Sequence, residues 1–285
     1  MTPHVSGLRA AIGRTETVED TIAPFQAAAL GATLDREDGL RAGDPLPPLW
    51  HWVYFHRIVP TRDLADNGHA KQGDFIPEMP LPRRMFAGAR LTFGRPLTIG
   101  ERARRTSTIA DIQWKRGASG ELVFMRVRNE LRGDAGGSVT EEQDIVYRAP
   151  LQPGAAERAR RTATRDPPWQ REFRANEMML FRYSALIFNA HRIHWDRPYA
   201  VQREGYPALV VHGQLVATLL ADLVRRESDR ALHAFRFRSL RALFDDRPCR
   251  LCGVPDAAGA DLWAEDETGA TAMEAHADFV ASSAA

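Results

Sequence analysis

The sequence predicts an α+β fold of two units, each combining a helix with an antiparallel sheet. Three observations support this fold class. A helical segment followed by strand segments occurs twice along the 285 residues. A connector poor in large apolar residues, APLQPGAAERARRTATRDPPW, separates the two copies. The length also suffices for two cores in units of about 130 to 150 residues. We therefore expect a first unit over residues 1–149, a linker over 150–169 and a second unit over 170–285.

The first unit is expected to begin with a helix over residues 18–30 and to continue as a sheet. Its predicted strands cover 90–93, 101–114, 121–131 and 141–147. The segments GRPLTIG, KRGASG and RGDAGGS separate these strands and contain the glycines that tight turns use. This spacing is typical of an antiparallel meander.

The second unit repeats the order with a long helix over residues 207–226. That segment, PALVVHGQLVATLLADLVRR, starts with a proline that suits a first helical turn and ends with two arginines that suit the negative end of a helix dipole. Its middle is apolar on nearly every face, so we expect its own sheet to wrap around it. The strands of this unit are predicted near 232–243, 247–254, 261–266 and 270–280.

Composition narrows the possible classes of protein. The formal net charge of +1 gives no overall support for nucleic-acid binding. No apolar run reaches the roughly 18 residues of a membrane span, and MTPHVSGLRAAIG lacks the pattern of a secretory signal, so we expect a cytoplasmic protein away from membranes. Cys249 and Cys252 are interpreted as reduced strand cysteines, and no metal site is expected.

The stretch RYSALIFNAHRIHWD, residues 182–196, concentrates the groups capable of chemistry and is followed by Val211-His212-Gly213. An imidazole can move a proton near neutral pH. Backbone amides at the start of a buried helix need acceptors, and a substrate carbonyl oxygen could be one. Glycine at that position lets a ligand approach the backbone closely.

These segments resemble the MaoC-like hydratases and dehydratases of acyl thioesters, which have the hotdog fold. FNAHRIH is most similar to the two-hotdog branch that contains mitochondrial hydroxyacyl-thioester dehydratase type 2 and the bacterial mesaconyl-CoA and itaconyl-CoA hydratases. The resemblance covers essentially the whole chain, including PPLWHW and RRMFAGARL. It implies a double hotdog in which each sheet wraps around a long central helix, with a first unit that shapes the acyl pocket and takes no part in catalysis.

The resemblance also implies roles for single residues. In the family an Asp and a His hold the water, within a motif of Asp, any residue, Asn, Pro, any residue and His. Here His194 takes the place of the catalytic His, and His191 takes that of the Asn. Asn189 takes that of the Asp and cannot accept a proton as a carboxylate would. Gly213 matches the position whose amide binds the thioester oxygen.

For three neighbouring side chains there are two hypotheses each: the side chain supports catalysis, or it only stabilises the local structure. His191 either acts directly or braces its loop, and His212 more simply serves the local structure because its side chain should point away from the Gly213 amide. Asp196 either tunes a histidine or pairs at the surface.

Candidates for substrate binding come from both halves. Trp50, Trp52 and Phe55 either line an acyl pocket or pack in the core. Arg236 and Arg238 alternate with two phenylalanines and either bind the phosphates of coenzyme A or form a solvated face. For a dicarboxylic acyl group, the arginines that could meet the distal carboxylate are Arg83, Arg84 and Arg192.

The expected activity is reversible addition of water to a 2-enoyl thioester. Coenzyme A would be part of the substrate, with no separate cofactor, and a short dicarboxylic substrate such as mesaconyl-CoA or itaconyl-CoA is one possibility. The alternatives are a dehydratase of 3-hydroxyacyl-ACP or 3-hydroxyacyl-CoA, a thioesterase and a non-catalytic acyl-thioester-binding subunit. One chain would already supply a hotdog pair, so it is expected to be a monomer or a homodimer.

Overall fold

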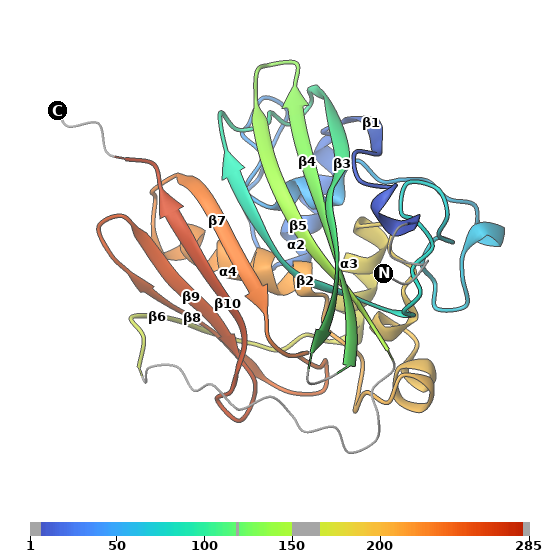
Figure 1. Cartoon of the computed structure of the whole chain (residues 1–285). Coiled ribbons are helices and arrows are strands. Elements are labelled where there is room, and N and C mark those ends of the chain that lie inside the picture. Colours follow the sequence, from blue (N-terminus) through green and yellow to red (C-terminus); the bar gives the residue numbers. More distant parts are fainter. Residues whose placement is uncertain (1–6, 118–119, 150–165, 282–285) are drawn as a thin grey trace.

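One antiparallel sheet of ten strands dominates the computed structural model, which describes residues 7–117, 120–149 and 166–281 (Figure 1). Its order is β1-β3-β4-β5-β2-β7-β10-β9-β8-β6. The strands of the first half are β1 (Thr15–Thr21), β2 (Arg83–Phe93), β3 (Arg102–Gly117), β4 (Gly120–Gly133) and β5 (Ser138–Arg148). Those of the second half are β6 (Trp169–Phe173), β7 (Leu232–Ser239), β8 (Cys249–Pro255), β9 (Gly259–Glu265) and β10 (Thr271–Phe279).

The two halves of the sheet have the same topology. Counted inward from each edge, the first half runs β1, β3, β4, β5, β2 and the second runs β6, β8, β9, β10, β7. The halves join where β2 pairs with β7, from Gly88 opposite Arg238 to Thr92 opposite Ala234. A Cβ atom at Gly88 would overlap the Phe237 carbonyl oxygen, so this junction depends on glycine. The duplicated strand order confirms the prediction of two similar units.

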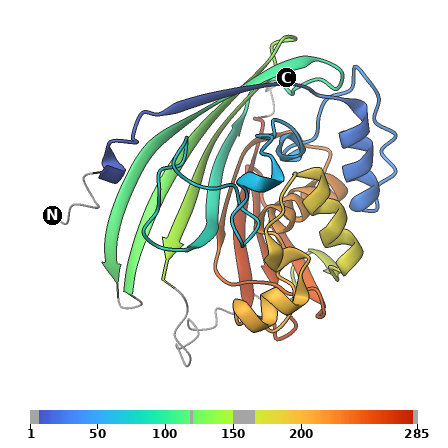
Figure 2. The same cartoon turned by 90° about the vertical axis from the view of Figure 1, so that its right-hand side faces the viewer.

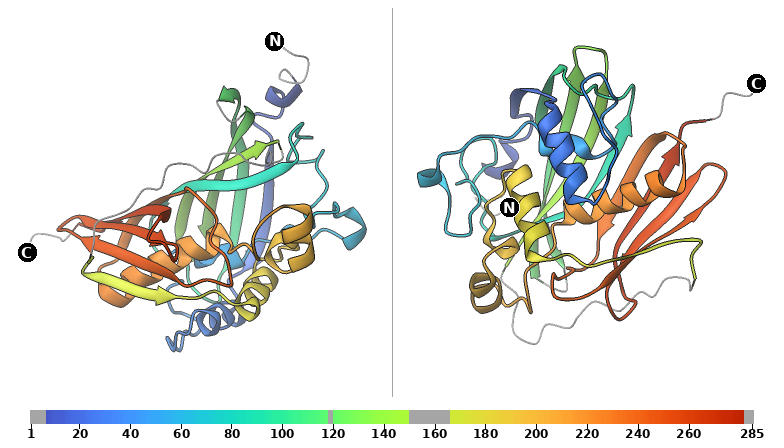
Figure 3. Two further views of the ribbon diagram at one scale, coloured as in Figure 1. Left: turned by 90° about the horizontal axis from the view of Figure 1, so that it is seen from below. Right: turned by 180° about the vertical axis from the view of Figure 1, so that it is seen from behind.

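The helices gather on the concave face of the curved sheet (Figures 2 and 3). They are α2 (Pro24–Thr33), α3 (Glu177–Leu186) and α4 (Gly213–Glu227), with the short helices η1 (Trp50–Val53), η2 (Thr61–Asp63), η3 (Arg192–His194) and η4 (Tyr199–Arg203). Helix α4 packs on β6 to β10, and all its residues from Leu215 to Val224 are buried. Its sheet therefore wraps around it, as its apolar faces predicted.

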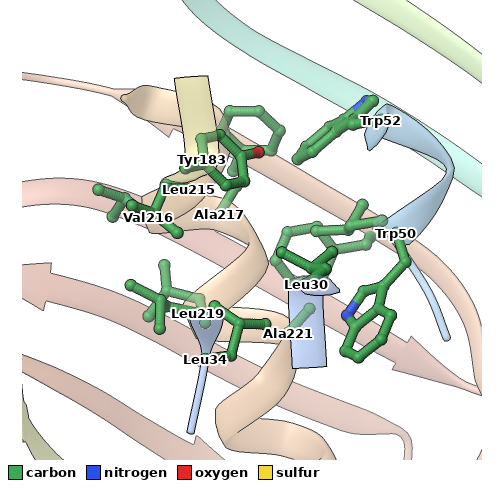
Figure 4. Close-up of a cluster of buried hydrophobic side chains, with 14 of the residues drawn as sticks. Leu30, Leu34, Trp50, Trp52, Tyr183, Leu215, Val216, Ala217, Leu219 and Ala221 are labelled. Atoms are coloured by element: carbon green, nitrogen blue, oxygen red, sulfur yellow. The ribbon is translucent and has the colours of Figure 1, made fainter. Parts of the chain in front are cut away.

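The helix of the first half is packed differently. Helix α2 has 10 residues against 15 in α4, and it packs mainly against α3 and η1. Figure 4 shows Leu30 of α2 and Trp50 of η1 beside Ala221 of α4. The expectation of a long central helix thus describes the second unit, whereas the first unit has a shorter helix that is not enclosed by its own sheet.

Two predicted helix starts and one predicted strand pairing are wrong. Residues 18–21 belong to β1, whose exposure alternates along the strand, and α2 starts only at Pro24. The meander holds for β3, β4 and β5, but β2 pairs with β5 and β7. The segment 207–212 is extended because the amides of Val210 and Val211 bond to Ile193 and Leu243, so α4 begins at Gly213.

The predicted linker and cysteines can be placed only in part. Residues 150–165 of the linker lie outside the described residues, and Trp169 already begins β6. Cys249 and Cys252 are buried free thiols on β8. No helix in the described ranges is both long enough and apolar enough to cross a membrane.

Candidate active site

A cavity of about 940 Å³ lies where the two halves meet. The first half contributes residues of η1, the loop around Gly68 and the inner faces of β2, β4 and β5, and the second half contributes the 184–195 segment and the start of α4. The cavity is therefore bordered by both units. His194, Asn189 and Gly213 all line it, so the structure brings together the three residues predicted to carry the reaction.

His194 is held as a neutral imidazole with one free nitrogen. Its Nδ1–H donates to the Val210 carbonyl oxygen at 2.7 Å, which leaves the lone pair on Nε2. The side chain is buried, and burial lowers the pKa of His194 to about 4 although the Val210 bond acts in the opposite direction. His194 is thus ready to accept a proton at neutral pH.

Four imidazoles form a row through the site. The His194 ring stacks on His212 with centroids 3.7 Å apart and planes 18° apart, and it meets the edge of His191 at 5.5 Å. His191 in turn lies 4.1 Å from His69. Burial, followed by the neighbouring positive charges, lowers the pKa of His191 to about 3. The row is therefore neutral at pH 7, and a positive charge is disfavoured along it.

His212 is the residue immediately before α4 and has a structural bond. Its Nε2 lies 2.8 Å from Ser184 Oγ, which ties α3 to the start of α4. Burial holds the pKa of His212 well below its usual range. This bond supports the structural reading of His212, while the stacking contact makes its ring a support for His194.

Gly213 opens α4 and presents its backbone amide at the cavity. Among the described residues, no acceptor bonds to the Gly213 N–H. A Cβ atom there would lie 3.6 Å from Ser239 Oγ and 3.9 Å from Phe86 Cδ1, which are ordinary van der Waals contacts. The amide and the helix dipole together can stabilise negative charge on a carbonyl oxygen.

Asn189 uses half of its side chain to form a turn. Its Oδ1 accepts the backbone N–H of His191 at 2.9 Å, whereas no bond within the described residues uses Nδ2. The remaining group is a donor, so it can hold the oxygen of a water molecule but cannot accept a proton from it. This geometry assigns proton acceptance to His194.

His69 belongs to the first half and was not predicted. The loop that carries it approaches residue 190 closely, because a Cβ at Gly68 would overlap the Ala190 carbonyl group. The backbone N–H of Arg192 also donates to Asn67 at 3.0 Å. A single histidine in a polar loop gives no signal of this packing in the sequence, so only the fold could reveal it.

A buried carboxylate in the first half was also missed. Glu141 Oε1 accepts from Trp52 Nε1 at 2.9 Å, and Oε2 accepts from Asn129 at 3.0 Å. Burial raises the pKa of Glu141, but the surrounding donors, His51 first, outweigh it and hold the pKa below its usual value. This network fixes Trp52, which lines the cavity together with Phe55 as one reading predicted.

Several predicted residues lie away from the cavity. Asp196 pairs with Arg192 at 2.8 Å, which supports its surface-pairing reading. Trp50 is buried in the core under the Arg225 guanidinium and does not line the cavity. Alternation along β7 turns Arg236 and Arg238 outward, opposite to the buried Phe235 and Phe237, so they do not line this cavity, and their exposure fits the alternative of a solvated face. Arg236 instead lies 3.2 Å from Asp278.

Within the described ranges, no three His, Cys, Asp or Glu side chains are grouped so that they could hold a metal ion. The groups that the site presents are an imidazole with a free nitrogen, a side-chain amide donor and a backbone N–H at a helix terminus. These groups suit proton transfer next to a carbonyl compound.

Comparison with known proteins agrees with this geometry. Residues 49–245 match the family described as hydroxyacyl-thioester dehydratase type 2. Mesaconyl-C(4)-CoA hydratase of Chloroflexus aurantiacus is 49% identical over 269 residues, which cover 93% of this chain and 95% of that protein. The mitochondrial hydroxyacyl-thioester dehydratase type 2 of Schizosaccharomyces pombe is 25% identical over 233 residues, 73% of this chain and 77% of that protein.

Solved structures confirm the fold. HtdX of Mycobacterium tuberculosis superposes with a TM-score of 0.65 at 18% identity and covers 94% of this chain and 100% of that one. A second M. tuberculosis protein, described as a double hotdog fold, gives a TM-score of 0.61 at 10% identity over 94% of this chain and 96% of that one. The chain is a double-hotdog acyl-thioester hydratase or dehydratase, and it belongs to the hydroxyacyl-thioester dehydratase type 2 family.

Proposed function

We propose that this protein reversibly hydrates mesaconyl-C(4)-CoA, a 2-enoyl thioester with a free carboxylate. The observation that carries the reaction type is the meeting of the free His194 Nε2 and the unbonded Gly213 N–H at one cavity. The proposed acyl group rests on the 49% identity to the Chloroflexus hydratase over nearly the whole of both chains.

The proposed steps use groups of the second half. Asn189 Nδ2 donates to a water oxygen, and His194 Nε2 takes one proton from that water while the hydroxyl oxygen bonds to C3. The thioester becomes enolate-like, and Gly213 N–H donates to its oxygen with the support of the α4 dipole. His194 then returns the proton to C2, so one molecule of water is added in total.

A second candidate is dehydration of a longer 3-hydroxyacyl thioester. The family match and the S. pombe relative favour it, since both are described as hydroxyacyl-thioester dehydratases. Dehydration uses the same groups in reverse. The two candidates differ in acyl group and in carrier, which is CoA for the first and could be ACP for the second.

The experiment is an assay of the purified full chain against mesaconyl-C(4)-CoA, crotonyl-CoA and a 3-hydroxyacyl thioester on CoA and on ACP. Loss or gain of enoyl-thioester absorbance reports each reaction. We expect the highest kcat/KM with mesaconyl-C(4)-CoA. A higher kcat/KM with a long 3-hydroxyacyl-ACP would select the second candidate, and turnover of none of the thioesters would reject both.

A further inference from the structure

The cavity carries an excess of positive charge among its described lining residues. The lining carboxylate is Glu141, and hydrogen bonds from Trp52 and Asn129 already occupy it. The arginines that line the cavity are Arg57, Arg84, Arg105 and Arg241. A cavity of this kind suits an anionic ligand.

Three of these arginines have carboxylate neighbours within the protein. Arg57 pairs with Asp74, and Arg241 lies 3.0 Å from Asp266. Arg105 lies 3.6 Å from Glu16. Their charges are therefore offset before any substrate binds.

Arg84 differs from the other three. In the described part of the chain no carboxylate lies within ion-pair distance of its guanidinium, although the side chain is half-buried. The other two arginines suggested by the sequence are committed elsewhere. Arg83 lies 2.7 Å from Glu204, and Arg192 lies 2.8 Å from Asp196.

The position of Arg84 directs it to the reacting end of the cavity. Arg84 and Phe86 are two residues apart on β2 and so share a strand face, at a spacing of about 6.6 Å. The Phe86 ring borders Gly213. Arg84, His69 and His191 line the same cavity, and beyond burial the Arg84 charge contributes to the lowered pKa of both histidines.

The chemistry of the proposed substrate favours a cation in this place. In mesaconyl-C(4)-CoA the free carboxylate is bonded to C3, the same carbon that receives the hydroxyl group. That carboxylate must therefore lie beside the water held by His194 and Asn189. A guanidinium can bind it through two parallel N–H bonds and offset its repulsion of the incoming oxygen.

Given the proposed function, we infer that Arg84 binds the free carboxylate of the acyl group and selects 3-carboxy-enoyl thioesters over uncharged ones. Carboxylate binding would offset the charge of a half-buried guanidinium that has no partner in the described protein. Arg84 is in this way a specificity-determining residue that contacts substrate, while proton transfer stays with His194.

The test pairs two substrates with two variants. Crotonyl-CoA has the same but-2-enoyl chain as mesaconyl-C(4)-CoA but carries no carboxylate on C3. Arg84→Gln should lower kcat/KM for mesaconyl-C(4)-CoA about 100-fold and leave that for crotonyl-CoA unchanged. Arg84→Lys keeps the charge without the bidentate geometry and should give an intermediate loss. Arg83→Gln is the matched control and should not change the ratio of the two substrates.

The outcomes separate the inference from the proposed function. A wild-type enzyme that hydrates crotonyl-CoA but not mesaconyl-C(4)-CoA would overturn the proposed substrate and the inference together. A wild-type preference for mesaconyl-C(4)-CoA that survives in Arg84→Gln would overturn the inference alone. Equal loss of both substrates in both Arg84 variants would also overturn it, because it would assign Arg84 a general structural role.

Discussion

The two halves share one strand order and differ in what covers the concave face. In the second half α4 fills the curve of β6 to β10. In the first half α2 packs on α3 and η1, and inner-face residues such as Leu131, Glu141 and Gln143 border the cavity instead. Duplication of the strands therefore did not duplicate the site. Under the proposed function, one half would provide the helix terminus that binds charge, and the other would provide the space for the acyl group.

The difference extends to the polar groups. The second half supplies a base and a donor at the start of α4, in His194 and Gly213. The first half supplies side chains that line the cavity, among them His69, whose ring contacts His191, which in turn contacts His194. The following predictions test this division of labour, from the largest expected effect to the smallest.

The two halves should respond unequally to loss of an imidazole. His194→Gln should lower kcat about 10³-fold, because it removes the proton acceptor. His69→Gln, the matched change in the first half, should lower kcat less than about tenfold, since the ring contact of His69 is with His191 and not with His194. Steady-state rates with the best thioester measure both. A larger loss in His69→Gln would contradict the division.

The amide at the start of α4 can be deleted without breaking the helix. Gly213→Pro removes the N–H, and proline is accepted at a first helical position. The preceding His212 has φ −60° and ψ 129°, which suits a residue before proline. We expect kcat to fall about 100-fold. Gly213→Ala keeps the amide and serves as the control, so an equal loss in both variants would assign the effect to crowding.

The contact between the halves at the other end of α4 should affect stability more than activity. The Asp222 carboxylate is fully buried and lies 2.8 Å from Arg36 of the first half and 2.7 Å from Arg226. Asp222→Ala should cost about 3–5 kcal/mol of unfolding free energy, because it leaves cations without their partner. Urea unfolding measures this.

Asp222 lies nine residues beyond Gly213, or about 13 Å along the helix, so the folded variant should keep its kcat. Asp229→Ala, at an exposed position just after α4, is the control and should leave stability nearly unchanged. A stable but inactive Asp222→Ala protein would show that this end of α4 also serves catalysis.

The pH dependence of kcat/KM should reflect the low pKa of the buried His194. Since burial lowers the pKa of His194 to about 4, kcat/KM should fall in acid near pH 4 and not near 6.5. The free energy of unfolding should also decrease in acid. Between pH 6.5 and pH 4 the histidine of the unfolded chain takes up a proton that the folded one does not, so lowering the pH destabilises the protein. His194→Gln should weaken that slope. An acid limb near pH 6.5 would indicate a solvated base.

Much of the site could be predicted because its residues are close in sequence to one another. His194 and Gly213 are 19 residues apart in the chain, and the apolar pattern of the helix that follows Gly213 indicates that its start is buried. The exact start could not be predicted, since Pro207 suits a first turn, whereas bonds of Leu209, Val210 and Val211 to distant residues keep that segment out of the helix.

The contributions of the first half depend on long-range packing and were therefore missed or left open. His69 reaches His191 only because Gly68 fits against Ala190. Glu141 is bonded to Trp52, which lies 89 residues earlier in the chain. Trp50 and Trp52 share a tryptophan-rich segment, yet one enters the core and the other the cavity, which composition alone does not distinguish.

The pairing of β2 with β7 fixes how far apart Arg84 and Gly213 lie, because Arg84 belongs to the first half and Gly213 to the second. If these residues bind the two ends of the acyl group as proposed, the strand register at this seam would limit the length of the acyl chains that fit. A slip of one residue would turn Arg84 to the outer face of the sheet. Gly88, close against Phe237, keeps the two strands together, so under the proposal it would affect substrate choice without touching the ligand.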